Sequence, residues 1–290
     1  MNRQWKAFLQ SRSAQLGGEE GAAFPDAPAN PDCALCDLSQ LGLIAVSGKD
    51  ATAFLQGQLT NDVRELSDGH SQLSSFCSPK GRMLASFRVL KVDGAYYLQL
   101  PRTQLEASLK RLRMFVLRAE VALTDASDDF ASIGLSGECA PRLLAPRFAS
   151  LPHRENDVTR QGELVLLRCS GSPPRFEAIG PPDAVAPLWD ALAEEARPVS
   201  SVYWSLLDIR AGIPTVYPET SDAFVPQMAN MQLIDGVSFH KGCYTGQEVV
   251  ARMQYLGKLK RRMYVARATL SPDAAAPAPG TVLSAPGSSS

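Results

Sequence analysis

Residues 239–251 read Phe-His-Lys-Gly-Cys-Tyr-Thr-Gly-Gln-Glu-Val-Val-Ala, and a single cysteine stands in the middle of this largely polar stretch. A cysteine that is kept for packing usually has apolar neighbours. Cys243 instead follows His240 and Lys241, whose charges would stabilise a thiolate. The residues themselves leave two interpretations open, in which Cys243 is either a reactive thiol or a half-buried packing residue.

A helix is predicted to begin directly after this cysteine. Thr245 and Glu248 have the spacing of a capping box, and apolar residues follow at helical spacing. The helix would therefore start at Gly246. The positive end of its dipole would add to the preference of Cys243 for the thiolate form.

The composition is that of a globular protein with little overall charge. The 290 residues are 45% hydrophobic and 20% charged, with a formal net charge of -1. This balance gives no global attraction to nucleic acid or to an acidic membrane. No apolar run approaches the roughly 20 residues of a membrane span, and the amino end has no secretory pattern. We therefore expect a cytoplasmic protein with no membrane partner, and an N-terminal leader with a Pro-rich linker over residues 1–37.

The other five cysteines suggest no site. Cys33 and Cys36 form the one close pair, and without a second pair they cannot complete a tetrahedral zinc site. They also follow a Pro-rich stretch rather than a strand, unlike a redox CxxC motif, so we interpret the pair as incidental. Cys77, Cys139 and Cys169 fall in strand or helix patterns and are predicted to be small core residues. No metal site is predicted.

Two parts of the sequence repeat one order of predicted elements. Each begins with a strand and a helix and continues with two strands and a second helix, which is typical of a split β-α-β unit. Asp93-Gly94 marks the hairpin of the first part. The architecture is therefore predicted to be mixed α+β, with strand structure again beyond Gly257. The predicted strands are 41–46, 84–92, 95–100, 121–124, 130–135, 163–169 and 175–180, and the predicted helices are 51–59, 105–116, 138–148, 183–196 and 202–211.

Four motifs together resemble the YgfZ family of folate-binding proteins, which are relatives of the glycine-cleavage T-protein. They are KGCYTGQE at 241–248, FVPQMANMQ at 224–232, AGIP at 211–214 and AVSGKDATAFLQGQLTNDV at 45–63. The resemblance extends from about Leu38 to Arg262. An octapeptide of mixed chemistry is far more specific than a lone glycine pattern.

The resemblance implies a fold, namely a three-domain ring around a central channel that holds tetrahydrofolate, with the cysteine of the KGCYTGQE motif, Cys243, facing the channel. Residues 38–128 together with 200–256 would bind the folate and carry the KGCYTGQE motif. Residues 129–199 would form a second α+β domain with a ferredoxin-like split β-α-β unit. Residues 257–290 would form part of a C-terminal β-barrel, which is expected to be cut short because family members continue past the region of Gly280.

The resemblance also implies a function. Family members act in assembling or repairing iron-sulfur clusters, especially in radical-SAM enzymes that methylthiolate tRNA. We therefore expect a monomeric, folate-binding accessory protein whose partners are such client enzymes, with transient contact to an iron-sulfur cluster. Cys243 would be the reactive thiol and Lys241 its catalytic neighbour. Two other classes stay open: a folate-dependent aminomethyltransferase or demethylase, and a scaffold that uses folate only structurally.

The implied folate contacts lie in several motifs. Trp204 could stack on the pterin ring, or it could be a core residue of its helix. Gln227 and Asn230 could offer paired amide hydrogen bonds to the ring, or they could cap their own loop. The remaining expected contacts are Glu177, Tyr244 and Gln247.

Some positions bear on which family activity is retained. Glu177 lies where the T-protein relatives place a glutamate that contacts the pterin, whereas Leu41 falls where some members have a second tryptophan. Ala85 and Ser86 stand where these relatives carry an Asp-Asp pair. Aminomethyl transfer needs an acid near the folate nitrogen. The resemblance therefore argues against that activity.

Two basic clusters are most simply interpreted as solvated surface. A functional alternative is an anion funnel for the polyglutamate tail of a folate. Direct tRNA binding is not expected, because the clusters lack interleaved aromatic residues and the chain is not basic overall. The clusters are Lys258, Lys260, Arg261 and Arg262, and Lys110, Arg111, Arg113 and Arg118.

Overall fold

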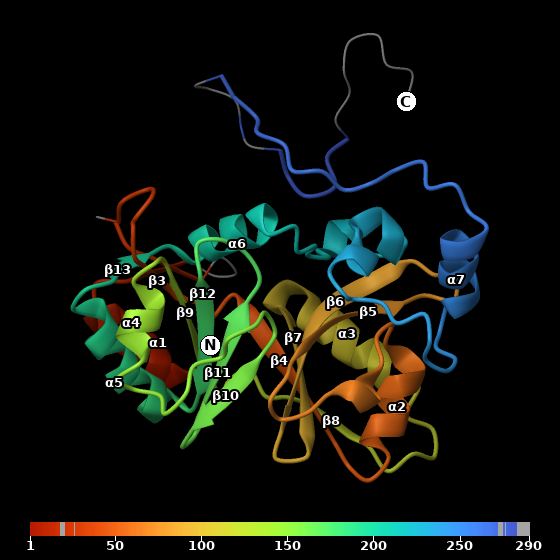
Figure 1. Cartoon of the computed structure of the whole chain (residues 1–290), viewed down its shortest axis with the longest axis horizontal. Helices are drawn as coiled ribbons and strands as arrows, with labels where there is room; N and C mark the ends of the chain where they lie inside the picture. The colour runs from red at the N-terminus through yellow and green to blue at the C-terminus, as the bar shows by residue number, and fades with distance from the viewer. Residues whose placement is uncertain (18–20, 26, 272–274, 276, 283–290) are drawn as a thin grey trace.

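The structure is a computed structural model that describes every residue except 18–20, 26, 272–274, 276 and 283–290. The described residues form two units of strands and helices that lie side by side (Figure 1). In each unit the helices cover one face of the sheet, and the other faces of the two sheets pack against each other. We call this junction between the two sheets the seam.

The first unit is an antiparallel sheet of five strands in the order β5-β6-β7-β4-β8. We call the apolar cluster between the helices and the sheet of a unit its outer core. In the first unit it includes Leu105, Leu109 and Leu112, which share one face of α3 because they follow helical spacing. The elements are β4 (Leu41–Ser47), α2 (Ala51–Gln58), η2 (Val63–Glu65), β5 (Gln72–Cys77), β6 (Met83–Val92), β7 (Ala95–Pro101), α3 (Arg102–Arg113) and β8 (Ala122–Asp125).

The second unit is a sheet of six strands in the order β10-β11-β12-β9-β3-β13. Its strands are antiparallel except for the parallel pair β3 and β13. The elements are β3 (Ala34–Asp37), β9 (Ala131–Ser136), α4 (Ala140–Leu144), β10 (Val158–Gln161), β11 (Leu164–Cys169), β12 (Arg175–Gly180), α5 (Pro182–Ala193) and β13 (Arg197–Val199).

The two sheets share one topology. The order β5-β6-β7-β4-β8 recurs as β10-β11-β12-β9-β13, with β3 inserted before the last strand. The predicted repeat of element order is therefore confirmed, although α4 is shorter than the predicted helix. Of the strands in the two sheets, β3, β5, β10 and β13 were not predicted. The six residues of β5 are all buried although half of them are polar, so this strand lacks the alternation that a half-exposed strand shows.

The last part of the chain crosses from the second unit to the first. Trp204 and Leu207 of α6 join the core of the seam. Val216, Met231 and Val250 then pack with residues of β5 and β6. The elements are α6 (Ser201–Arg210), η3 (Pro218–Thr220), η4 (Pro226–Ala229), η5 (Met231–Leu233) and α7 (Gln247–Tyr255).

The amino end, which was expected to be a leader and linker, packs into the second unit. Helix α1 (Arg3–Ser11) places Trp5 and Leu9 in the outer core of that unit, where Trp5 meets Trp189 of α5 edge to face. The Trp5 indole Nε1 also donates a hydrogen bond of 2.8 Å to Asp37 of β3. A small sheet of β1 (Gln15–Gly17) and β2 (Gly21–Ala23) follows.

The prediction for two of the cysteines is wrong. Cys33 and Cys139 form a disulfide across 106 residues, so Cys139 is not a simple packing residue and Cys33 is not incidental. Cys36, Cys77 and Cys169 are free and buried, which confirms the core role predicted for the last two. A disulfide is uncommon in cytosolic proteins, so this pair gives no support to a cytoplasmic location.

The strand structure predicted beyond Gly257 is not observed. Residues 257–271, 275 and 277–282 contain no strand, and the sheets of the described chain do not close into a barrel. A strand needs a neighbour for its backbone hydrogen bonds. Met263 forms only isolated hydrogen bonds. Its N–H donates to the Met228 carbonyl, and its own carbonyl accepts from the Asn230 side chain. Within the described residues, no helix is long and apolar enough to span a membrane.

We predict that the amino-terminal helix contributes strongly to stability. Trp5 is 1% exposed, so Trp5→Ala should lower the free energy of unfolding by about 3–5 kcal/mol through the cavity that it leaves. Trp5→Phe should cost about 1–2 kcal/mol, because it removes chiefly the hydrogen bond to Asp37. Urea denaturation of both variants measures this. Losses below about 0.5 kcal/mol for both, a typical surface effect, would show that α1 is not part of the folded core.

Candidate functional site

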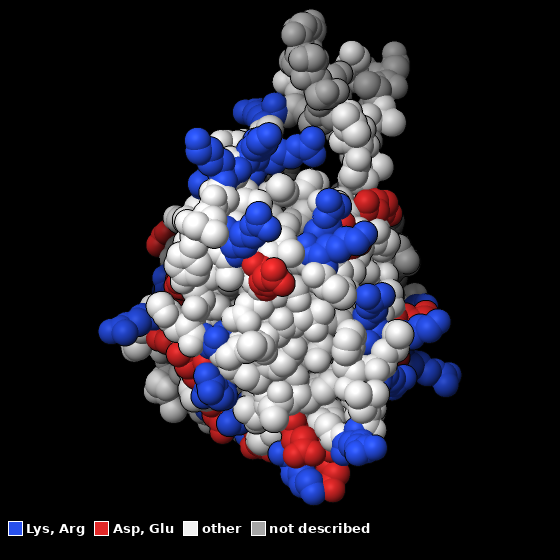
Figure 2. Space-filling model, turned by 90° about the vertical axis from the view of Figure 1, so that its right-hand side faces the viewer, with Lys and Arg blue, Asp and Glu red and all other residues white. Residues whose placement is uncertain are grey.

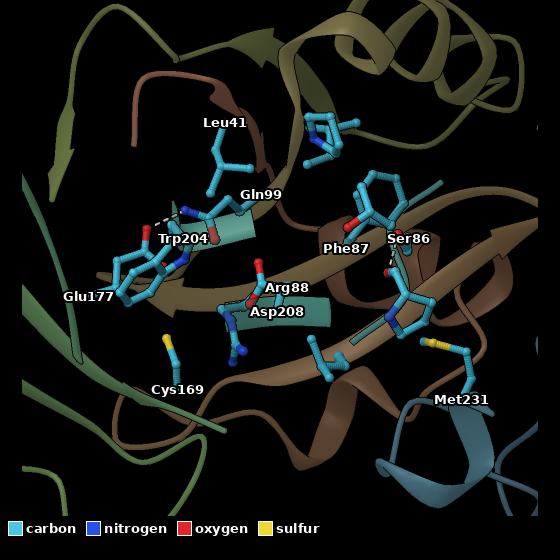
Figure 3. A pocket seen from close by; sticks show the side chains of 15 residues that line it. Leu41, Ser86, Phe87, Arg88, Gln99, Cys169, Glu177, Trp204, Asp208 and Met231 are labelled. Atoms are coloured by element: carbon cyan, nitrogen blue, oxygen red, sulfur yellow. Dashed lines mark hydrogen bonds between the residues drawn. The ribbon is translucent and has the colours of Figure 1, made fainter. Parts of the chain in front are cut away.

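A cavity of about 80 Å³ opens at one end of the seam, and both units line it (Figure 3). Arg88 and Gln99 reach it from β6 and β7 of the first sheet. Glu177 reaches it from β12 of the second sheet, and Trp204 from α6. We call this space the seam cavity.

Glu177 is the buried carboxylate of the seam cavity, with 1% of its surface exposed. Gln99 Nε2 and Ser132 Oγ both donate hydrogen bonds of 2.5 Å to its Oε1. Burial raises the pKa of Glu177, and these two hydrogen bonds partly offset that effect. No described residue donates to Oε2. The second oxygen is therefore an acceptor without a protein partner in the described chain.

Trp204 is held in place on the second sheet. Its ring packs on the backbone of Gly134 in β9, where an added Cβ would lie 2.5 Å from the indole. The Arg175 guanidinium lies 5.0 Å from the ring centroid, and it forms an ion pair of 2.7 Å with Asp208, one turn further along α6. Position 134 therefore requires glycine if Trp204 is to keep this place.

Ser86 takes part in backbone contacts at the other side of the cavity. Its hydroxyl donates to the Pro214 carbonyl at 3.1 Å and accepts from the Val216 N–H at 3.2 Å. Ala85 belongs to the outer core of the first unit. The carboxylates that line the seam cavity are thus Glu177 and Asp208, and neither comes from the strand that carries Ser86.

The loop that contains Cys243 is anchored by Lys241, which is 6% exposed. Its ammonium donates to the backbone carbonyls of Gln56, Leu59 and Asn61, at 2.8, 2.5 and 2.9 Å. These carbonyls lie at the end of α2, where helical partners are missing. Burial lowers the pKa of Lys241 to about 8. All three donors are thus used within the protein, which places Lys241 as an anchor of the loop.

The next residues of the motif fix the start of α7. Tyr244 is buried with its ring 5.1 Å from the Lys241 ammonium. Gly246 has φ 83°, and an added Cβ would lie 2.4 Å from the Ser78 carbonyl. The helix begins at Gln247, one residue from the predicted start, but the predicted capping box is wrong. Gly246 rather than Thr245 is the N-cap, and no side chain caps the helix.

Cys243 lies in this loop as the exposed free cysteine of the described chain. It does not line the seam cavity. His240, three residues earlier, lines a larger cavity of about 660 Å³, and Leu73 belongs to both cavities. The structure therefore brings Glu177 and Trp204 together but leaves Cys243 exposed and outside the seam cavity, against the expectation that it faces the folate.

Comparison with known proteins shows which family the chain belongs to. Residues 29–241 match the family described as the GCVT N-terminal domain. The chain is 37% identical over 234 residues to the tRNA-modifying protein YgfZ of Colwellia psychrerythraea, covering 81% of this chain and 71% of that protein. It is 35% identical over 247 residues to the same protein of Klebsiella pneumoniae, covering 85% and 75%. The chain belongs to the YgfZ family.

The fold of this YgfZ-family chain is also seen in a solved structure of an enzyme. The glycine cleavage system aminomethyltransferase T from Bartonella henselae matches with a TM-score of 0.71, over 88% of this chain and 74% of that one. The sequences are 17% identical. The match therefore shows a shared fold alone.

The other predicted contacts of this YgfZ-family chain have structural partners. Gln227 Nε2 donates to the Val250 carbonyl at 2.7 Å, and Asn230 Nδ2 donates to the Met263 carbonyl at 2.9 Å. Gln247 Nε2 lies 3.5 Å from the Gly242 carbonyl. None of these side chains, nor Tyr244, lines the seam cavity. Their contact with a folate stays a prediction.

Sequence reasoning missed the residues that hold the site. Gln99 and Ser132 bind Glu177, and Arg175 lies behind Trp204. Gln99 is a polar residue inside the largely apolar strand β7. This is the one sequence signal that could have indicated a role for Gln99. Its partner stands 78 residues away in the other sheet. In the described residues, no group of three or more His, Cys, Asp or Glu could hold a metal ion.

We predict opposite consequences for two neighbours in this loop. Lys241→Met should lower the free energy of unfolding by about 2–4 kcal/mol, because three carbonyls lose a charged donor. Cys243→Ser should change it by less than about 0.5 kcal/mol, since the side chain is exposed. Chemical denaturation of both variants tests this. Equal stability of Lys241→Met and the unmodified protein would contradict the anchoring role.

Proposed function

We propose that this YgfZ-family chain binds a tetrahydrofolate in the seam cavity and supports iron-sulfur enzymes that modify tRNA, with Cys243 as its reactive thiol. The observation that carries the folate part is the buried Glu177 carboxylate with one unpartnered oxygen beside Trp204. The relatives are named tRNA-modifying proteins, which supports the second part.

The polar groups of the seam cavity fit a pterin. A pterin edge carries N–H groups side by side, and a carboxylate accepts such a pair in the bidentate manner. Glu177 offers Oε2 directly, while Gln99 already donates to Oε1. The cavity of about 80 Å³ is smaller than the roughly 300 Å³ of a ligand pocket. Binding of a pterin therefore requires side chains that line the cavity to move apart.

The folate would supply a carrier nitrogen for one-carbon groups, and the chain's own residues would bind and orient it. Glu177 would fix the edge of the pterin, and Trp204 would contact its flat face. The indole is already packed on Gly134 and beside Arg175, so it is preorganised and loses little freedom on binding. The seam would exclude water from one end of the ligand.

Cys243 would act at the protein surface that meets the client enzyme. A soft thiolate suits iron-sulfur chemistry, but one cysteine cannot hold a whole cluster. The cluster would therefore be a substrate, with its remaining ligands supplied by the client enzyme. This role agrees with a thiol that is exposed to partners rather than facing the seam cavity. We infer that the protein would perform this role as a monomer in the cytoplasm.

One-carbon transfer is less well supported by the site. Transfer from a folate nitrogen needs a free acid or base beside that nitrogen. Ser86 is occupied by the Pro214 carbonyl and the Val216 N–H. Asp208 is paired with Arg175. The carboxylate left without a cationic partner is Glu177, which the pterin edge would occupy.

We predict that folate affinity depends on the seam cavity and not on the thiol. Titration of tetrahydrofolate by calorimetry should show a loss of about 10- to 100-fold for Glu177→Gln, because a charged hydrogen bond is removed. Trp204→Ala should lose about tenfold or more. Cys243→Ala should bind within twofold of the unmodified protein, since it lies outside the cavity, a difference of about 0.4 kcal/mol.

Glu177→Gln also separates a binding defect from unfolding. Burial raises the pKa of Glu177 in the folded state. Ionisation of Glu177 therefore lowers the free energy of unfolding once the pH rises above the pKa that this residue has in the unfolded chain. The uncharged amide should therefore leave the folded state at pH 7 as stable as before, or more stable. Unchanged folate affinity in this stable variant would refute the seam cavity as the folate site.

We predict that Cys243→Ser abolishes the support of iron-sulfur enzymes while folate binding is kept. The measurement is the methylthiolation of tRNA in cells that lack their own copy and express the variant. Glu248→Gln, an exposed change in the same motif, is the matched control and should behave like the unmodified protein. Full methylthiolation with Cys243→Ser would instead favour a scaffold that does not use the thiol.

A further inference from the structure

A second cavity meets the seam cavity at Pro214 and Thr215, which line both. Its volume is about 260 Å³, larger than that of the seam cavity. Ser86 fixes the shared wall through its bonds to the Pro214 carbonyl and the Val216 N–H. A ligand that is bound at Glu177 and extends past this wall would enter the second cavity.

The walls of the second cavity are apolar and flexible. Met83, Met228 and Met263 line it together with Phe224. Methionine side chains adapt to flat rings and make favourable contacts between sulfur and aromatic groups. The main chain on one side is fixed, because the Met263 N–H donates to the Met228 carbonyl at 2.7 Å. The cavity thus suits an aromatic ring better than a polar ligand.

Two arginines stand at this cavity, Arg261 and Arg262. Both are exposed, and neither forms an ion pair within the described part of the chain. The sequence from Leu256 to Ser271 contains no acidic residue. Lysine and arginine side chains gather at the upper end of the face in Figure 2, where the C-terminal segment leaves the body. The lining of the second cavity therefore carries positive charge.

We propose that the second cavity holds the p-aminobenzoyl ring of the folate and that Arg261 and Arg262 bind its γ-linked glutamates, so that the chain selects polyglutamylated folates. This inference rests on the proposed folate site. Each added glutamate brings one carboxylate, and arginine binds carboxylates through paired N–H donors. The seam cavity supplies a carboxylate for the pterin, and the second cavity supplies methionines for the benzoyl ring and arginines for the glutamates.

The test compares tetrahydrofolate that carries one glutamate with the same folate that carries three. Tryptophan fluorescence should give the unmodified chain an affinity about three- to tenfold higher for the triglutamate, as expected for two exposed ion pairs. The preference should shrink as the ionic strength rises from about 0.05 to 0.5 M. Arg261→Gln/Arg262→Gln should bind both folates equally, and Arg261→Glu/Arg262→Glu should prefer the monoglutamate.

The matched control is Lys110→Gln/Arg111→Gln, which removes two exposed charges from α3 and should keep the preference. Equal binding of both folates by the unmodified chain would overturn the inference, and so would a preference that survives Arg261→Gln/Arg262→Gln. In either case the monoglutamate would still bind, and the proposed function would stand. Failure of the monoglutamate to bind at all would instead reject the folate site itself.

Discussion

The candidate site in the seam is built on one contact, the hydrogen bond that Gln99 of the first sheet donates to the buried carboxylate of Glu177 in the second. Burying a carboxylate is costly unless its oxygens are satisfied. Here both donors converge on Oε1, and no hydrogen bond of the described chain reaches Oε2. Such a group is a poor way to hold two sheets together. It is a good way to prepare a site for a ligand that brings its own donors.

The repeated topology explains why the site lies at the seam. In each unit the helices cover one sheet face, so the opposite faces must bury each other. Residues two apart in a strand point to the same face. On β6 and β12 this places Arg88 and Glu177 at one end of the seam, and Leu90 and Ile179 further along it. The seam is thus apolar in its middle and polar at one end, where a cavity and a ligand site can form.

Much of this architecture could be predicted from local sequence. The hairpin at Asp93-Gly94, the leucine stripe of α3 and the repeated order of elements are short-range patterns. Glu177 and Trp204 could be identified only through the family resemblance, because nothing near them in the sequence indicates a shared cavity. Gln99 escaped prediction since its role depends on a strand of the other unit, and the partner of Cys33 lies 106 residues away. Strand β5 was missed because its serines are buried, against the usual pattern.

In the octapeptide at 241–248, the residues that stabilise the fold differ from the residue that is proposed to react. Lys241 holds the end of α2, Tyr244 fills the space beside it, and Gly246 allows α7 to approach the turn at Ser78. These contacts account for the anchoring residues of the motif but leave the sulfur of Cys243 without a structural task. Because this thiol is exposed and lies outside the seam cavity, whatever it reacts with arrives from the solvent side. Under the proposed function, the folate and the thiol would then serve one client enzyme from two different surfaces.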